Sequence, residues 1–201
     1  MWEEAKHLSM IVQDTARIEH SDHEIHLCER DKSAVLKNVY ICNITQQGIS
    51  LKADCHAEAF FKKNYGNRRC DCITLSEYNS KRVALFIDMK SKSLDDRDVS
   101  TGMPQLHNGE YPDYVCQLKS SSCFFDFLSS VVNDFCNCDA LYQYTKESHR
   151  FFVILHNKKL PSLSTIIPRL KTKPNNTPET ALVLYVDEGS KLNFESLIIE
   201  E

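Results

Sequence analysis

Three side chains in the middle of the sequence have the types and the spacing for chemistry on a phosphate ester. Asp71 begins one apolar segment of the chain, and Asp88 and Lys90 close the next one. Carboxylate oxygens are the ligands that hard divalent cations such as Mg²⁺ prefer. A lysine ammonium beside them can orient or activate the attacking water or stabilise the negative charge that develops around phosphorus. The pattern therefore predicts metal-assisted phosphodiester hydrolysis, in which Asp71 and Asp88 hold the ion and Lys90 positions the water.

The spacing of an acid two residues before a lysine carries little information by itself. A chain with 28 acids and 16 lysines among 201 residues contains about two such pairs by chance, and this chain has two, Glu4–Lys6 and Asp88–Lys90. Only the second pair follows a hydrophobic segment and has an acid at the start of the preceding one. The simpler alternative is a strand that ends in solvated charges.

A β-hairpin is the element that must bring these residues together. Residues 71–76 (DCITLS) and 83–89 (VALFIDM) read as two strands, and the polar segment EYNSK between them reads as a turn. In an antiparallel hairpin the start of the first strand meets the end of the second, so Asp71 is expected beside Asp88. Side chains two residues apart in a strand share a face, so Asp88 and Lys90 point the same way.

The remaining segments alternate between strand and helix patterns. Short strands are expected within 15–51, a helix near 54–64 that carries Glu58, a polar surface excursion over 91–113, and a strand or strand-to-helix junction at 113–119 (DYVCQLK). A helix over 122–136 and two buried strands, 151–156 and 181–186, complete the pattern. This order predicts an α/β fold of the mixed α+β kind, with a central mixed sheet flanked by helices. The length predicts one domain over 1–201, with an N-terminal β-rich decoration (1–50), a core (51–160), and a basic connection with a C-terminal strand (161–201).

The order of a helical Glu, a strand Asp, a turn, an apolar strand and Asp-x-Lys resembles the PD-(D/E)XK nuclease superfamily. The resemblance covers roughly residues 50–155 and implies the restriction-endonuclease-like fold. It implies that Glu58 orients the site or binds a second ion, that Asp71 and Asp88 are metal ligands, and that Lys90 is the catalytic lysine. The segment Gln117–Ser120 is similar to a Gln-containing motif beside the site in some of these nucleases. Two departures are Cys70 in place of the Pro and Asp in place of the common Glu at 88.

The resemblance also implies a cofactor and partners. The cofactor is Mg²⁺ or Mn²⁺, held by Asp71, Asp88 and the backbone carbonyl of Met89. The substrate is nucleic acid, and DNA is expected more than RNA. Many members of this size look like effector nucleases of bacterial anti-phage systems that work beside an ATPase subunit, which makes an ATPase an expected protein partner.

Charge is distributed unevenly along the chain. The net charge of −4 argues against indiscriminate binding of polyanions, but residues 52–69 carry five bases against two acids, and residues 146–173 carry seven against one. Such bases contact phosphates without reading sequence. The residues expected to contact nucleic acid are Lys62, Lys63, Arg68, Arg69 and Gln117.

Other functions remain open at this level. The same fold could be a catalytically idle subunit that binds a protein or nucleic acid, or an unrelated α+β domain with a coincidental motif. A zinc site is disfavoured, because the paired thiols (Cys70–Cys72 and Cys136–Cys138) lack the two to four intervening residues of structural zinc sites. Nine cysteines, no signal peptide pattern and no long apolar run predict a cytoplasmic protein without a membrane span.

Overall fold

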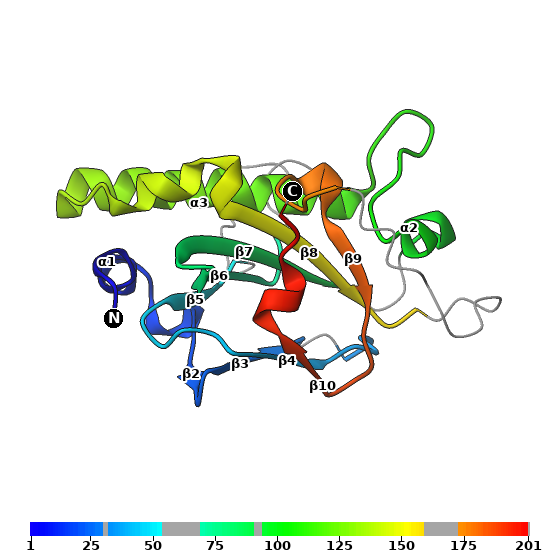
Figure 1. The fold of residues 1–201 in the computed structure, drawn as a ribbon, viewed down its shortest axis with the longest axis horizontal. Helices are drawn as coiled ribbons and strands as arrows, with labels where there is room; N and C mark the ends of the chain where they lie inside the picture. Colours follow the sequence, from blue (N-terminus) through cyan, green and yellow to red (C-terminus); the bar gives the residue numbers. More distant parts are fainter. Residues whose placement is uncertain (30–31, 54–68, 91–93, 159–172, 201) are drawn as a thin grey trace.

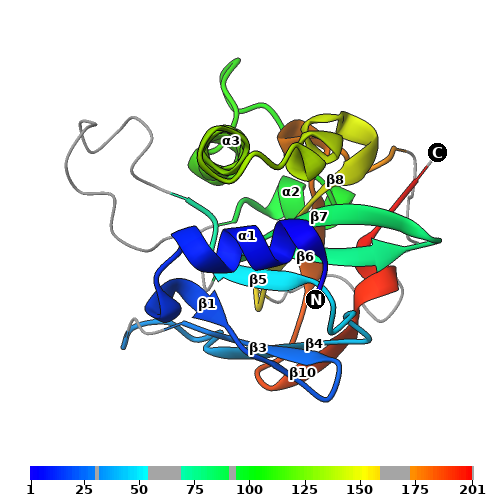
Figure 2. The same cartoon turned by 90° about the vertical axis from the view of Figure 1, so that its left-hand side faces the viewer.

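The computed structural model describes residues 1–29, 32–53, 69–90, 94–158 and 173–200, and these ranges are arranged in three layers (Figure 1, Figure 2). A six-stranded sheet lies in the middle. The long helix α3 (Asp113–Cys136) covers one of its faces, and a four-stranded sheet covers the other. The predicted α/β class with a central mixed sheet is confirmed.

The central sheet has the strand order β1-β5-β6-β7-β8-β9. The pairs from β1 to β7 are antiparallel, whereas β8 is parallel to β7 and β9 is parallel to β8. The strands are β1 (Arg17–Ile18), β5 (Ile49–Lys52), β6 (Cys72–Tyr78), β7 (Lys81–Lys90), β8 (Arg150–His156) and β9 (Leu182–Tyr185).

The predicted hairpin is present, formed by β6 and β7. Its register runs from Cys72 opposite Ile87 to Tyr78 opposite Lys81. The two turn residues, Asn79 and Ser80, both have positive φ, 48° and 61°. Two consecutive left-handed residues give the turn a twist that matches the twist of the two strands, which keeps the hairpin in register.

The continuous apolar run of β7 follows from burial on both faces of the sheet. Ala84 and Phe86 face the helical side, where they pack with residues of α3. Val83, Leu85 and Ile87 face the four-stranded sheet. Because successive side chains of a strand point to opposite faces, a strand covered on both sides has no solvated position.

The four-stranded sheet combines three strands from the N-terminal part of the chain with one strand from the C-terminal part. Its order is β10-β4-β3-β2, and β10 is parallel to β4, with Ser190 opposite Val39. The Glu188 carboxylate accepts hydrogen bonds from the backbone N–H groups of Lys37 and Asn38, which fixes the entry to β10. The strands are β2 (His20–Ser21), β3 (Glu24–Cys28), β4 (Asn38–Cys42) and β10 (Ser190–Asn193).

Helix α3 begins earlier than the sequence pattern predicts. A helix over 122–136 is confirmed, but the segment 113–119, expected to be a strand or a strand-to-helix junction, is the start of the same helix. Tyr114, Val115 and Leu118 continue the buried stripe of the helix, and this tertiary contact outweighs the strand preference of the local sequence. Within the described ranges, no helix combines the length and apolar character needed to cross a membrane.

A shorter helix, α1 (Glu3–Ile11), packs beside the C-terminal part of α3 (Figure 1). Among the described residues, five 3₁₀ helices connect the larger elements. They are η1 (Asp14–Ala16), η2 (Ala140–Thr145), η3 (Glu147–His149), η4 (Pro178–Thr180) and η5 (Phe194–Leu197).

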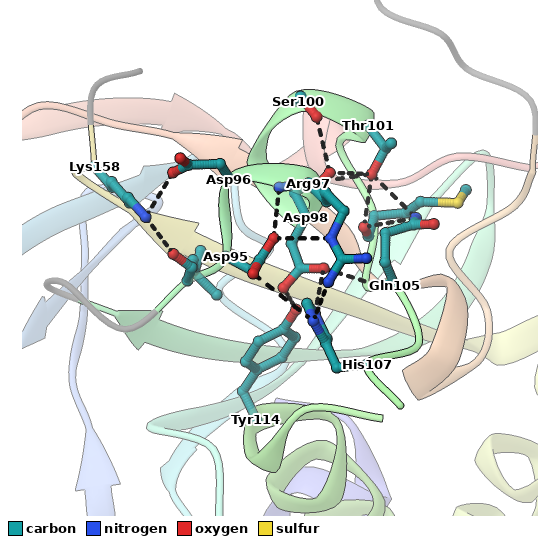
Figure 3. Close-up of polar contacts among 12 residues, drawn as sticks. Asp95, Asp96, Arg97, Asp98, Ser100, Thr101, Gln105, His107, Tyr114 and Lys158 are labelled. Atoms are coloured by element: carbon teal, nitrogen blue, oxygen red, sulfur yellow. Dashed lines mark hydrogen bonds and ion pairs between the residues drawn. The ribbon is translucent and has the colours of Figure 1, made fainter. Parts of the chain in front are cut away.

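The segment 91–113, expected to be an irregular surface excursion, contains the helix α2 (Asp96–Thr101). A polar network around the buried Asp98 ties this helix to α3 (Figure 3). The Asp98 carboxylate accepts hydrogen bonds from the Tyr114 hydroxyl and from the backbone N–H of Gln105 at 2.9 Å, and His107 Nε2 lies 3.4 Å away. Because these donors satisfy the hydrogen-bonding capacity of the buried Asp98 carboxylate, this polar segment can fold against the core.

Replacing Tyr114 by Phe is expected to lower the free energy of unfolding by about 1.5–3 kcal/mol, the usual contribution of a hydrogen bond to a charged group. Burial and the Asp98 carboxylate raise the pKa of Tyr114 above its ordinary value, which favours the protonated hydroxyl that donates this bond. Urea denaturation measures the change. The matched control is Tyr111→Phe, an exposed residue of the same segment, which should change stability by less than about 0.5 kcal/mol. Equal stability of the two variants would contradict a structural role for the network.

Candidate functional site

The hairpin places the acids and the lysine at one end of β7. Cys72 is opposite Ile87 in the register, so Asp71, the next residue outward, lies opposite Asp88. Asp88 and Lys90 share the face of the sheet that carries Phe86, the face covered by α3. The structure therefore brings together Asp71, Asp88 and Lys90, as the sequence predicts.

Lys90 is held between the sheet and the first turns of α3. Its ammonium donates a hydrogen bond to Gln117 Oε1 at 2.6 Å and another to Asp88 Oδ1 at 3.1 Å. The side chain is 18% exposed, so the charge sits at the rim of the core with access to solvent. Gln117, expected to contact nucleic acid, thus orients the lysine from the helix.

Asp88 is the most deeply buried member of the site. It is 1% exposed, and burial raises its pKa to about 6 even though the Lys90 ammonium favours the ionised form. Its Oδ2 lies 2.9 Å from Lys90 Nζ, but in a direction that makes no hydrogen bond, and no described residue donates to it. A buried carboxylate oxygen without a donor is costly, and a cation relieves that cost.

Asp71 adds a second carboxylate to the same space. Its Oδ2 accepts the backbone N–H of Met89 at 2.5 Å, which fixes the side chain against the end of β7. Burial, and then the neighbouring Asp88, raise the pKa of Asp71 well above its ordinary value. The pKa of each carboxyl is raised mainly by burial, so ionising both acids in this space favours a compensating cation.

The residues present fit a hard divalent ion. Asp71 and Asp88 offer carboxylate oxygens side by side, and Oδ2 of Asp88, which accepts no hydrogen bond from the described residues, is available as a ligand. The Met89 side chain points to the opposite face of the sheet, so the site meets only the backbone of this residue. Ligation by the Met89 carbonyl stays a prediction.

Several expected residues lie elsewhere. Glu58, Lys62, Lys63 and Arg68 lie outside the described residues. Arg69 is described: its guanidinium stacks on the Phe124 ring, 3.9 Å from the ring centre, and the residue is 9% exposed. Its contact with nucleic acid stays a prediction.

Sequence reasoning missed His156, which ends β8 directly beside Lys90 in the parallel register. Burial, helped by the charge of Lys158, lowers the pKa of His156 to about 4, so the ring is neutral near pH 7. The backbone N–H of Lys158 donates to its Nδ1 at 3.2 Å, which leaves the proton on Nε2. The apolar run before His156 marks the end of a strand, as the run before Asp88 does, but it does not indicate which strand is the neighbour.

Glu29 is the second missed residue. Its negative charge raises the pKa of both Asp71 and Asp88, although burial is the largest cause for each. Together with Asp71 and Met89, Glu29 lines a hollow of about 1730 Å³ between the two sheets and the end of α1. Nothing in the local sequence around Glu29 relates it to the hairpin.

Neither family models, nor curated proteins, nor solved structures give a match to this chain.

Proposed function

We propose that this protein is a metal-dependent nuclease that hydrolyses phosphodiester bonds, in DNA more than in RNA. The observation that carries the proposal is the convergence of two carboxylates, that of Asp88 fully buried, and one lysine at the end of β7, with one Asp88 oxygen that accepts no hydrogen bond from the described residues. The chain order of hairpin, helix and parallel strand around this point supports the restriction-endonuclease-like assignment that the sequence resemblance implies.

Each side chain has a distinct part in this mechanism. Asp71 and Asp88 would hold Mg²⁺ or Mn²⁺, which would lower the pKa of a bound water and neutralise charge on the phosphate. The Lys90 ammonium has three N–H donors, of which two are used on Asp88 and Gln117. The third is available to the attacking water or to a phosphate oxygen, and the two fixed bonds orient it.

Charge around the site limits how substrate binds. The described lining of the hollow beside Asp71 contains more acids than bases. The acids are Asp14, Glu19, Glu29 and Asp71, and the bases are Arg17 and Lys52. An acidic lining attracts a divalent ion and repels a polyanion, so substrate affinity must depend on the ion and on bases elsewhere in the chain.

The acidic lining also favours the second candidate, a catalytically idle subunit of the same fold. Helix α3 carries exposed Phe127 and Phe135, which are 62% and 84% exposed, and exposed aromatic side chains are common where a protein partner binds. In this function Asp88 and Lys90 would serve as a structural ion pair.

A cleavage assay separates the two functions. The purified chain is incubated with linear DNA, circular DNA and RNA in Mg²⁺, in Mn²⁺ and in excess EDTA. The nuclease should cleave at least one substrate with metal, stop in EDTA, and recover when metal is restored. An Asp88→Asn preparation, purified in parallel, controls for contaminating nucleases. Absence of metal-dependent cleavage, or equal cleavage by both preparations, would leave the idle subunit as the better reading.

A further inference from the structure

A second group of metal-ligating side chains lies where α1 meets the end of α3. Glu3 and His7 are four residues apart on α1 and therefore lie on one side of the helix. Cys138 follows the C-terminus of α3. One potential ligand atom from each of the three residues lies within 4.8 Å of the other two, and His7 Nε2 is 3.8 Å from Glu3 Oε1.

Core packing on both elements holds these residues together. Ala5 and Leu8 bury the inner face of α1 in the same core cluster as Val132 of α3. Asn137 ends α3 in the left-handed conformation, with φ of 50°, and this turn directs Cys138 inward, where it is 5% exposed. The neighbouring Glu4 is bound by Arg82 at 2.8 Å and by the Tyr144 hydroxyl at 3.0 Å, so the N-terminal turn of α1 is anchored.

Two potential ligand atoms of this cluster, one on His7 and one on Cys138, have no hydrogen-bond partner among the described residues. His7 Nδ1 is buried and has no hydrogen-bond partner among the described residues. Since no hydrogen bond fixes the protonated nitrogen of the ring, either nitrogen can serve as a ligand. Within the described part of the chain, the Cys138 thiol likewise makes no hydrogen bond. By contrast, Cys70 and Cys72 both have partners within 3.3 Å.

From this geometry we infer that Glu3, His7 and Cys138 form a binding site for Zn²⁺, separate from the site at the end of β7. A thiolate, an imidazole and a carboxylate are the ligands of zinc, whereas Mg²⁺ and Ca²⁺ select oxygen alone. Donors on a tetrahedral zinc ion lie roughly 3.4–3.8 Å apart, so the side chains must close by about 1 Å. The Glu3 side chain is 73% exposed, which leaves the fourth position open to water.

The two metal sites lie at opposite ends of β7. Glu4, next to Glu3, is bound to Arg82 near the start of the strand, whereas Asp88 and Lys90 are near its end. Asp88 lies six positions along the strand from Arg82, a distance of roughly 20 Å. Zinc at this site ties α1 to the end of α3, so it raises the melting temperature without contacting the nuclease site.

Cobalt titration of the metal-free full-length chain tests the site, because a thiolate ligand gives Co²⁺ a sulfur charge-transfer absorption. We expect one Co²⁺ per chain with this absorption, displaced by Zn²⁺. The absorption should be lost in Cys138→Ser and retained in the matched control Cys136→Ser, and it should persist in Asp88→Asn. Glu3→Gln and His7→Gln should each weaken Co²⁺ binding at least tenfold, since even the residues that support metal ligands contribute 10–100-fold to affinity.

The exposed position of Glu3 keeps the test independent of folding. Glu3→Gln changes a solvated side chain, so a weaker affinity in this variant reports ligation rather than a folding defect; circular dichroism of each variant verifies the fold. A wild-type protein without the sulfur absorption would overturn the inference. So would an absorption that survives Cys138→Ser, or unchanged affinity in both Glu3→Gln and His7→Gln.

Discussion

Asp88→Asn is expected to reduce metal-dependent cleavage at least a thousandfold while the protein keeps its fold. The substitution replaces an anionic ligand by a neutral amide of the same size at the deepest point of the site. Loss of a metal ligand removes several kcal/mol of transition-state stabilisation, and each 1.36 kcal/mol corresponds to a factor of ten in rate. Single-turnover cleavage at saturating substrate measures the loss.

The same variant has a stability signature that does not depend on activity. The pKa of Asp88 is raised to about 6 in the fold, so the contribution of this group to stability is complete below its ordinary pKa near 3.8 and is lost as the pH rises through 6. Without metal, Asp88→Asn should therefore melt at a higher temperature than the wild type above pH 7, and the difference should vanish near pH 4. Added Mn²⁺ should raise the melting temperature of the wild type but leave that of the variant unchanged.

Asp134→Asn on the exposed side of α3 is the control, and it should change neither cleavage nor melting. Undiminished Mn²⁺ binding and cleavage in Asp88→Asn would place the metal elsewhere in the chain.

Lys90→Ala is expected to lower the single-turnover rate by a factor on the order of 10²–10³, with nearly unchanged affinity for nucleic acid. This is the usual size of the effect for one electrostatic catalytic group, and the loss should appear in the rate of the bound complex. Lys90→Arg should restore little, because the larger guanidinium cannot keep the 2.6 Å contact with Gln117 and the contact with Asp88 in the same space.

Lys81→Ala provides the matched control on the same strand. Lys81 begins β7, is 53% exposed, and pairs at 3.2 Å with Glu200, so its removal should leave the rate of the bound complex unchanged. If Lys90→Ala cleaves at the wild-type rate, Lys90 is a structural partner of Asp88 and the idle-subunit function gains support.

The sequence by itself determined the hairpin and the residues at its end. Two apolar runs and the polar turn between them are local properties, and they are sufficient to predict that β6 and β7 pair and that Asp71 meets Asp88. The face shared by Asp88 and Lys90 follows from the period of the strand alone. The C-terminal half of α3 could also be predicted from the sequence, because its apolar residues keep helical spacing over several turns.

Tertiary structure alone decided which other residues reach the site. The start of α3 at Asp113 depends on the packing of Tyr114 and Val115 against the central sheet, and this packing turns Gln117 toward Lys90. His156 lies beside Lys90 only because β8 pairs in parallel with β7 in one register.

The contacts between distant parts of the chain have no local signal at all. The pairing of β10 with β4, the arrangement of Glu29 near the two aspartates, and the meeting of Glu3 and His7 with Cys138 join segments far apart in sequence. Local propensity and periodicity indicate which face of a helix or strand is buried. They do not indicate which other element covers that face, and these contacts depend on that choice. The sequence therefore determined the β6–β7 hairpin, and the packing of the layers decided its surroundings, because long-range register is a property of the whole core.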